Sequence, residues 1–150
     1  MRLVTRAVVL IIPLLAATPV ARAGDPVLAL LDPYFRIQSQ LTADTTDGIK
    51  DNATAIAKQA QALGEAGKDI SAAADSLGAS STLAAARTAF GQLSEAVIAY
   101  AEHAKANPGA DVNTMYCPMV KKSWMQKGEP VRNPYLGKSM IDCGEKKKAS

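Results

Sequence analysis

The sequence predicts an all-α protein: a small antiparallel bundle of three to four helices, with an irregular C-terminal segment rich in Cys and Met packed on it. Over residues 27–104, apolar positions recur at alternating spacings of three and four, which places them on single helix faces. Alanine is frequent in this stretch and runs of β-branched residues are absent, and both features favour helix. The pattern stops at Asn-Pro-Gly at 107–109, and the composition changes beyond it.

The first 23 residues have the order of a secretory signal peptide. Arg2 and Arg6 form a basic start, an apolar run covers 7–17, and the small-x-small cleavage site Ala-Arg-Ala follows. The run is too short to span a bilayer comfortably and Pro13 interrupts it, although an uncleaved membrane anchor is the alternative. We therefore expect a periplasmic protein with no membrane association after signal cleavage, in a compartment that permits disulfides.

Each predicted helix has its own apolar stripe. In the first stripe, Asp32-Pro33 indicates either a kink or a helix that starts at Pro33. Thr46 or Asp47 can cap the second helix, and a short third piece lies between Gly67 and Gly78. Short links between helices favour an antiparallel bundle. The stripes are Val27, Leu30, Tyr34, Ile37 and Leu41; Ile49, Ala53, Ile56, Ala60 and Leu63; Ile70 to Leu77; and Leu83, Ala86, Phe90, Leu93, Val97, Tyr100 and Ala104.

The chain that remains after signal cleavage is long enough for one domain with a buried core. We expect residues 24–110 to form the helical bundle, 111–145 to form a Cys/Met segment of the same domain, and 146–150 to be a basic tail. Residues 24–110 carry six Lys/Arg and ten Asp/Glu, whereas the residues from 111 onward carry eight Lys/Arg and four Asp/Glu. The two parts should therefore pack together, or the C-terminal part should face an acidic partner. No basic stripe with interleaved aromatics is present, so nucleic acid is not an expected partner.

Sulfur is concentrated in the C-terminal segment. Apart from the initiator, every Met lies between positions 115 and 140, and the two cysteines, Cys117 and Cys143, bracket nearly the same window. A generic core would spread Met along the helices as a gap-filler. Three interpretations remain open: a disulfide between the two cysteines, which the compartment permits; a soft-metal site; or a small core of Met around Trp124.

The metal interpretation rests on ligand chemistry. Thiolates and thioethers select Cu(I), with Ag(I) as a mimic, over hard cations. The chain has too few Cys and His residues for a structural zinc site. Pro118 favours extended backbone, which would point the sulfurs of Cys117 and Met119 to the same side. A helical turn capped by Asn133 would place Met140 and Cys143, three residues apart, on one face. The candidate ligands are Cys117, Met119, Met140 and Cys143, with Met115, Met125 and His103 as additional candidates.

Enzyme signatures are missing from the sequence. It has one His, no Ser/His/Asp grouping, no HExxH and no phosphate-binding Gly-rich loop. The two cysteines are too far apart to be a CxxC redox pair, and no thioredoxin-like βαβ pattern accompanies them. We therefore expect a protein that is not an enzyme.

The same segment resembles the C-terminal signature of a bacterial domain-of-unknown-function family. The resemblance lies in Tyr-Cys-Pro-Met at 116–119, Trp-Met-Gln at 124–126, Asn-Pro-Tyr-x-Gly at 133–137 and Met-x-x-Cys-Gly at 140–144. The family more often has Leu where this chain has Met125, and the stretch 90–96 also resembles the part that precedes its signature.

Members of that family occur alone in periplasmic proteins and appended to copper/silver efflux adaptor (membrane fusion) proteins. The resemblance implies a helical periplasmic domain that handles heavy metals, with copper as the leading ion, an efflux adaptor as partner, and Cys117, Met119, Met140 and Cys143 as ligands. Two hypotheses follow. The first is a periplasmic Cu(I)-binding protein in metal handling or efflux. The second is a structural or interaction module in which a Cys117–Cys143 disulfide holds a basic tail against a partner.

Overall fold

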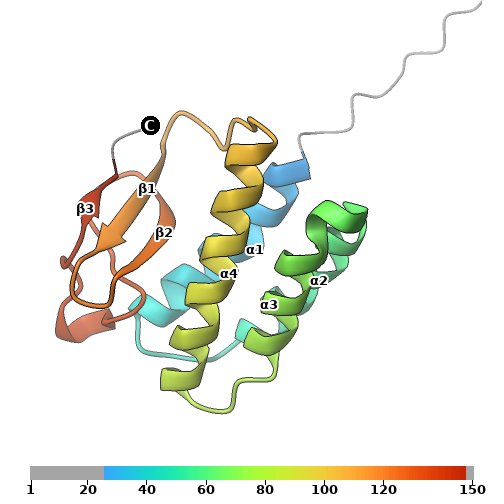
Figure 1. Ribbon diagram of the computed structural model, residues 1–150. Coiled ribbons are helices and arrows are strands. Elements are labelled where there is room, and N and C mark those ends of the chain that lie inside the picture. The colour runs from blue at the N-terminus through green and yellow to red at the C-terminus, as the bar shows by residue number, and fades with distance from the viewer. Residues whose placement is uncertain (1–25, 148–150) are drawn as a thin grey trace, which may run out of the picture.

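The computed structural model describes residues 26–147, a range that leaves the predicted signal peptide outside the described residues. Four helices in this range run alternately up and down, and a small sheet lies beside them (Figure 1). No helix within 26–147 is long and apolar enough to cross a membrane. The elements are α1 (Pro26–Thr42), α2 (Ile49–Gln61), the 3-10 turn η1 (Gly64–Gly67), α3 (Lys68–Gly78), α4 (Leu83–His103), β1 (Val112–Cys117), β2 (Lys122–Lys127), the 3-10 turn η2 (Gly137–Ser139) and β3 (Glu145–Lys146).

The predicted helices are confirmed, with corrections at their ends. Helix α1 begins at Pro26 and continues through Pro33, so a start at Pro33 is wrong. The residue before α2 is Gly48, in the left-handed conformation with φ of 75°, and no side chain caps this helix end. Glycine adopts that conformation without steric penalty, so the chain enters α2 through a backbone turn and not through a Thr or Asp cap. Thr82 does cap α4, because its hydroxyl accepts a hydrogen bond from the Ala85 N–H.

The expected fold class is confirmed in part: the protein is mostly helical, but the C-terminal segment is not irregular and the fold is not all-α. The segment forms a three-stranded antiparallel sheet of order β2-β1-β3, although the protein as a whole is mostly helical. In β1 and β2, Met115 pairs with Trp124 and Cys117 pairs with Lys122. In β1, Met115 and Cys117 are buried and Tyr116 between them is only partly buried, whereas in β2 the three successive residues Trp124, Met125 and Gln126 are all buried. The period-two pattern that indicates a strand is therefore short in β1 and absent from β2.

Aromatic residues join the sheet to the helices in one core. The rings of Tyr34 on α1 and Phe90 on α4 lie 5.0 Å apart, Phe90 and Tyr135 lie 6.0 Å apart, and Tyr135 and Trp124 lie 5.9 Å apart. Two of these aromatic residues also form hydrogen bonds with backbone groups on the outer edge of β2. The Tyr34 hydroxyl accepts from the Met125 N–H at 3.0 Å, and the Tyr135 hydroxyl donates to the Ser123 carbonyl. These contacts protect an edge strand and fix the sheet against α1 and α4.

Arg87 on α4 connects the C-terminal segment to α1. Its guanidinium donates to the Leu41 carbonyl at 3.1 Å, to the Pro134 carbonyl at 3.0 Å and to the Asp44 carboxylate. Gly137, with φ of 55°, passes so close that an added Cβ would overlap the Asp44 carboxylate and the Arg87 guanidinium. This arrangement gives the segment a fixed attachment point on the bundle.

Replacing Gly137 by Ala is expected to destabilise the protein by about 3 kcal/mol, from left-handed strain together with disruption of the ion pair. The matched control is Gly128→Ala, at φ of 62° with open space around the added Cβ, which should cost about 1 kcal/mol. Urea unfolding followed by circular dichroism measures both variants. Equal losses in the two would show that the contact with Asp44 and Arg87 adds nothing.

The ion pair also predicts a pH dependence. The hydrogen bond from Arg87 lowers the pKa of Asp44 below its ordinary value, against a smaller opposing effect of burial. Because the folded-state pKa is depressed, the stabilisation is present above the unfolded-state pKa of about 3.9 and disappears as pH falls through the folded-state value. The Tm difference between wild type and Asp44→Asn should therefore be largest near neutral pH and vanish in acid. A difference that does not change with pH would contradict this origin.

Candidate metal centre

The two cysteines meet at one end of the sheet. Cys117 is the last residue of β1 and is fully buried, whereas Cys143 is partly buried and precedes β3. Both are free thiols, with their Sγ atoms 3.2 Å apart. A disulfide needs about 2.05 Å between the sulfurs, and two in-line metal–thiolate bonds of about 2.3 Å would need about 4.6 Å. The pair thus lies between the two geometries, and a movement of about 1.5 Å or less reaches either one.

A tight turn holds Cys117 from one side. Residues 118–121 connect β1 to β2, with Lys121 in the left-handed conformation at φ of 54°. Burial by itself would raise the pKa of Cys117. The backbone N–H of Val120, the thiol of Cys143, the side chain of Asn133 and the N–H of Met119 oppose burial, and the pKa ends below its ordinary value. The site therefore favours a thiolate at Cys117.

Cys143 has the opposite character. Its hydrogen bond to Cys117 raises its pKa, and burial together with the charges of Cys117 and Asp142 acts in the same direction. Of the two thiols, Cys117 therefore has the lower pKa and is the one that ionises first. Such a pair offers two sulfur ligands that become anionic when a metal displaces their protons, Cys117 more readily than Cys143.

Asn133 is the centre of the loop that carries Cys143. It is fully buried, its Oδ1 accepts from the Tyr135 N–H at 2.8 Å and the Leu136 N–H at 3.1 Å, and its Nδ2 donates to the Cys143 carbonyl at 2.5 Å. Its backbone N–H also donates to the Ile141 carbonyl at 2.7 Å. One side chain thus fixes the turn after position 133 and the chain at position 143, ten residues apart.

Gln126 orders the chain before that loop. Its Oε1 accepts from the Trp124 indole N–H at 3.2 Å and the Arg132 N–H at 3.0 Å, while its Nε2 donates to the Gly128 and Pro130 carbonyls. Every polar atom of this buried amide therefore has a partner. The Trp and Gln of the signature hold residues 128–132 in place, and Asn133 continues the path to Cys143.

The candidate methionines Met119 and Met140 flank the pair at the surface. Met119 is 60% exposed and Met140 is 41% exposed. The expected extended backbone at Pro118 is wrong, because 118–121 form a turn that separates the buried Cys117 from the exposed Met119. The expected helical turn that would align Met140 with Cys143 is also absent: the Cys143 N–H donates to the Met140 carbonyl in a non-helical turn, and Met140 has φ of −152°.

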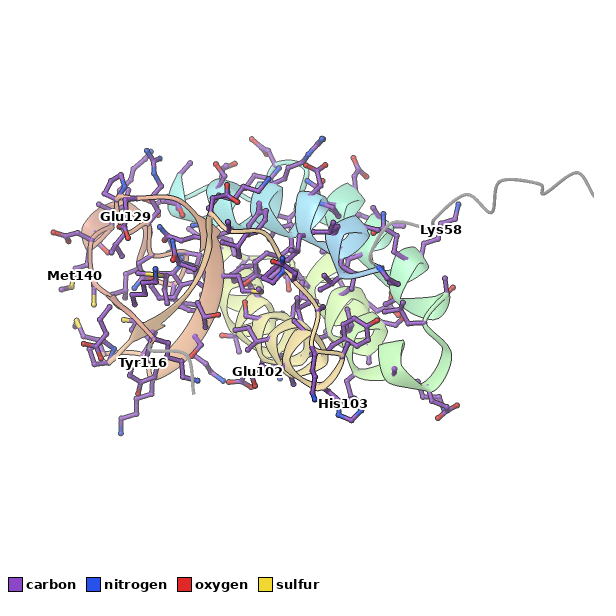
Figure 2. All side chains as sticks on the ribbon, turned by 90° about the horizontal axis from the view of Figure 1, so that it is seen from above. Lys58, Glu102, His103, Tyr116, Glu129 and Met140 are labelled. Atoms are coloured by element: carbon purple, nitrogen blue, oxygen red, sulfur yellow. The ribbon has the colours of Figure 1, made fainter. Side chains whose placement is uncertain are left out.

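The additional candidates lie in different places. Met115 is buried two residues before Cys117, on the same face of β1. Met125 faces the other side of the sheet and lines a pocket together with Ile98 and Ala101 of α4. His103 is exposed at the end of α4, and Figure 2 shows it well away from Met140, which lies at the outer end of the C-terminal segment. The structure therefore does not bring His103 or Met125 to the sulfur pair.

A groove lies beside the site. It has a volume of about 650 Å³ and lies between the first half of α4 and the β1–β2 turn, with Leu83, Arg87, Val120, Lys122 and Tyr135 among its lining. Its two cations are already paired, Arg87 with Asp44 and Lys122 with Glu95. The groove meets the sulfur pair through Val120, whose backbone N–H is directed at Cys117.

Sequence reasoning found the sulfur atoms but missed the residues that position them. Gln126 and Gly137 stood out only as parts of a resemblance, Asn133 was expected to cap a turn but not to hold the chain at Cys143, and Arg87 did not stand out at all. The signal for Asn133 was its place before Pro134, because Asn-Pro initiates turns through the Asn side chain. Within residues 26–147, no group of three or more His, Cys, Asp and Glu side chains is arranged to hold a metal ion.

Comparison with known proteins gives one match. A family described as protein of unknown function (DUF3347) matches residues 30–109, which run from α1 to just beyond α4. The matched range ends before β1, so the two cysteines and the motifs around them lie outside it. No curated protein and no solved structure matches the chain.

Proposed function

The chain belongs to the DUF3347 family of proteins of unknown function, and from this premise we propose that it is a periplasmic heavy-metal-binding protein, selective for Cu(I), that takes part in metal handling or efflux. The observation that carries the proposal is the reduced cysteine pair, with Sγ atoms 3.2 Å apart at the rim of the sheet. Cys117 and Cys143 would hold the ion, which is the cargo of the protein and not a cofactor for chemistry.

The surroundings of the pair suit a soft monovalent ion. Two thiolates and two nearby thioethers are the ligand types that select Cu(I), and Ag(I) as its mimic, over Mg²⁺, Ca²⁺ and Mn²⁺. Backbone N–H groups directed at Cys117 and a buried Asn133 stabilise negative charge on sulfur, a typical support for a metal-bound thiolate. The resemblance of the C-terminal motifs to domains on copper/silver efflux adaptors supports an adaptor as the partner. The predicted signal peptide supports a periplasmic location.

A competition titration tests the proposal. Reduced protein is titrated anaerobically with Cu(I) held by a chromogenic chelator such as bathocuproine disulfonate, and transfer of one Cu(I) per chain is expected. Emission from Trp124, the only Trp in the sequence, gives a local readout, because Gly144 next to Cys143 lies against its ring. Failure of the reduced protein to compete for Cu(I) or Ag(I) would overturn the proposal.

One observation also favours a second candidate, a structural or interaction module closed by a Cys117–Cys143 disulfide. Sulfur atoms 3.2 Å apart are close enough for oxidation to join them with little movement of the backbone. The two candidates exclude each other at any one moment, since a disulfide has no thiolate to give to a metal. Thiol labelling and mass spectrometry of protein taken directly from the periplasm distinguish them: two free thiols support the metal protein, and none supports the disulfide module.

A further inference from the structure

Exposed apolar side chains gather around the sulfur pair. Among residues 26–147, the exposed large hydrophobic side chains are Leu28, Met119, Met140 and Ile141. Three of these four lie in the two turns that carry Cys117 and Cys143. Exposed apolar side chains grouped in this way indicate a contact surface.

The backbone ties the two methionines to the two cysteines. The N–H of Met119 is directed at the sulfur pair, and the Met140 carbonyl accepts the Cys143 N–H at 3.1 Å. Each thioether therefore starts from a residue in direct backbone contact with a site cysteine. Figure 2 shows Met140 at the outer end of the molecule, on the side away from the helices.

Building on the proposed function, we propose that Met119 and Met140 are exchange ligands, which bind the metal ion while it enters or leaves, and that the two cysteines are the resident ligands. A thiolate is anionic and Cys117 is fully buried, whereas a thioether is neutral and both methionine side chains are exposed. Fixing an exposed Met side chain costs up to about 1.5–2 kcal/mol of rotamer entropy. Resident coordination by the methionines therefore adds little affinity, but a mobile soft ligand at the rim can take the ion when a thiolate releases it.

The exchange proceeds by replacement of one sulfur ligand at a time. The ion forms a bond to a rim thioether as its bond to Cys143 breaks, and then forms a bond to a first sulfur ligand of the partner as its bond to Cys117 breaks. Finally it forms a bond to a second sulfur ligand of the partner as the thioether bond breaks. Copper stays Cu(I) throughout, no electron moves, and the protons that the cysteine thiols lose on loading return to them from solvent on release. Without the thioethers, the ion would have to become under-coordinated between donor and acceptor.

The charges around the rim define the partner. Lys121, Lys138 and Lys146 are exposed beside the two turns, against the acidic Asp142 and Glu145. The rim is thus net positive, and it suits an acidic partner that presents soft sulfur ligands. Such complementarity acts mainly on the rate of encounter and weakens with salt.

The test measures affinity and transfer rate separately. Met119→Leu/Met140→Leu removes both thioethers and keeps the apolar volume, and Met125→Leu is the matched control, because its thioether faces α4 on the other side of the sheet. Cu(I)-loaded protein is mixed with bathocuproine disulfonate in a stopped-flow instrument, and Trp124 emission checks that both variants are folded. The double variant should release Cu(I) about tenfold more slowly while its affinity changes by less than about threefold. The control should match wild type.

The outcomes separate this inference from the proposed function. If wild-type protein does not bind Cu(I), both fall. If it binds and the double variant transfers the ion at the wild-type rate, only the exchange role is overturned. If affinity and stoichiometry collapse together in the double variant, the methionines are resident ligands and the exchange role is again overturned. Slower transfer also in Met125→Leu would attribute the effect to a general loss of thioether and overturn the placement at the rim.

Discussion

Replacing Cys117 by Ser is expected to lower the Cu(I) affinity of the reduced protein by at least about 100-fold, or about 2.7 kcal/mol. Cys117 is the buried member of the pair and the one whose pKa is lowered by surrounding donors. A Ser hydroxyl is a hard ligand that remains protonated at neutral pH, so it cannot replace a soft anionic sulfur. Competition with bathocuproine disulfonate measures the loss, and helical circular dichroism verifies the fold.

The same variant distinguishes the disulfide candidate. A Cys117–Cys143 disulfide would close a loop with a sequence separation of 26 and stabilise the protein by about 3.5 kcal/mol on the chain-entropy estimate. If that is the native state, Cys117→Ser and Cys143→Ser should each remove that stability from protein isolated under oxidising conditions, and neither should change metal affinity. Metal affinity lost without loss of stability in the reduced protein supports the Cu(I) site.

The helices could be predicted from the sequence because each carries its own repeating signal. In α4, Phe90, Leu93 and Val97 recur with the helical period and are all buried in the structure. The spacing of apolar residues is a local property, and it survives whatever else the chain packs against.

The sheet could not be predicted in the same way because its signals depend on tertiary structure. Trp124 and Gln126 are both buried on one face of β2. In the sequence alone, a Gln at this position would be interpreted as a solvent-facing residue. Its burial is favourable only because Trp124, Arg132 and two carbonyls of the following loop satisfy its amide. None of those partners can be identified before the loop is folded.

The candidate site was predictable in composition and not in geometry. That Cys117 and Cys143 lie together agrees with the sequence-based interpretation, which required them to meet for a disulfide or for a metal. The division into two buried or half-buried thiols and two exposed thioethers arises from the turn at 118–121 and from Asn133, which sets the path to Cys143. Turn geometry of this kind depends on side-chain to backbone hydrogen bonds that ligand spacing does not reveal.

Asn133→Asp is expected to have the second large effect, because it keeps the shape of the side chain and replaces its hydrogen-bond donor by an acceptor. The carboxylate can still accept from the N–H groups of Tyr135 and Leu136, but it cannot donate to the Cys143 carbonyl or to Cys117. It would instead place a buried anion against a carbonyl oxygen and the Cys117 sulfur. Leaving these acceptors unpaired beside a charge should destabilise the protein by about 3 kcal/mol and lower Cu(I) affinity by at least about tenfold.

Asn113→Asp, the same chemical change at a partly exposed position on β1, is the matched control and should leave both properties near wild type. Acidification provides a second readout, because a protonated carboxyl regains a donor. The folded-state pKa of the introduced carboxyl should lie above its unfolded-state value, so the destabilisation is present above that raised pKa and is relieved as pH falls through it. Urea unfolding of the Asn133→Asp variant at neutral and acidic pH, relative to wild type, measures this recovery. A pH-independent deficit, or a Cu(I) affinity equal to that of the control, would show that Asn133 does not position the cysteine pair through its donor.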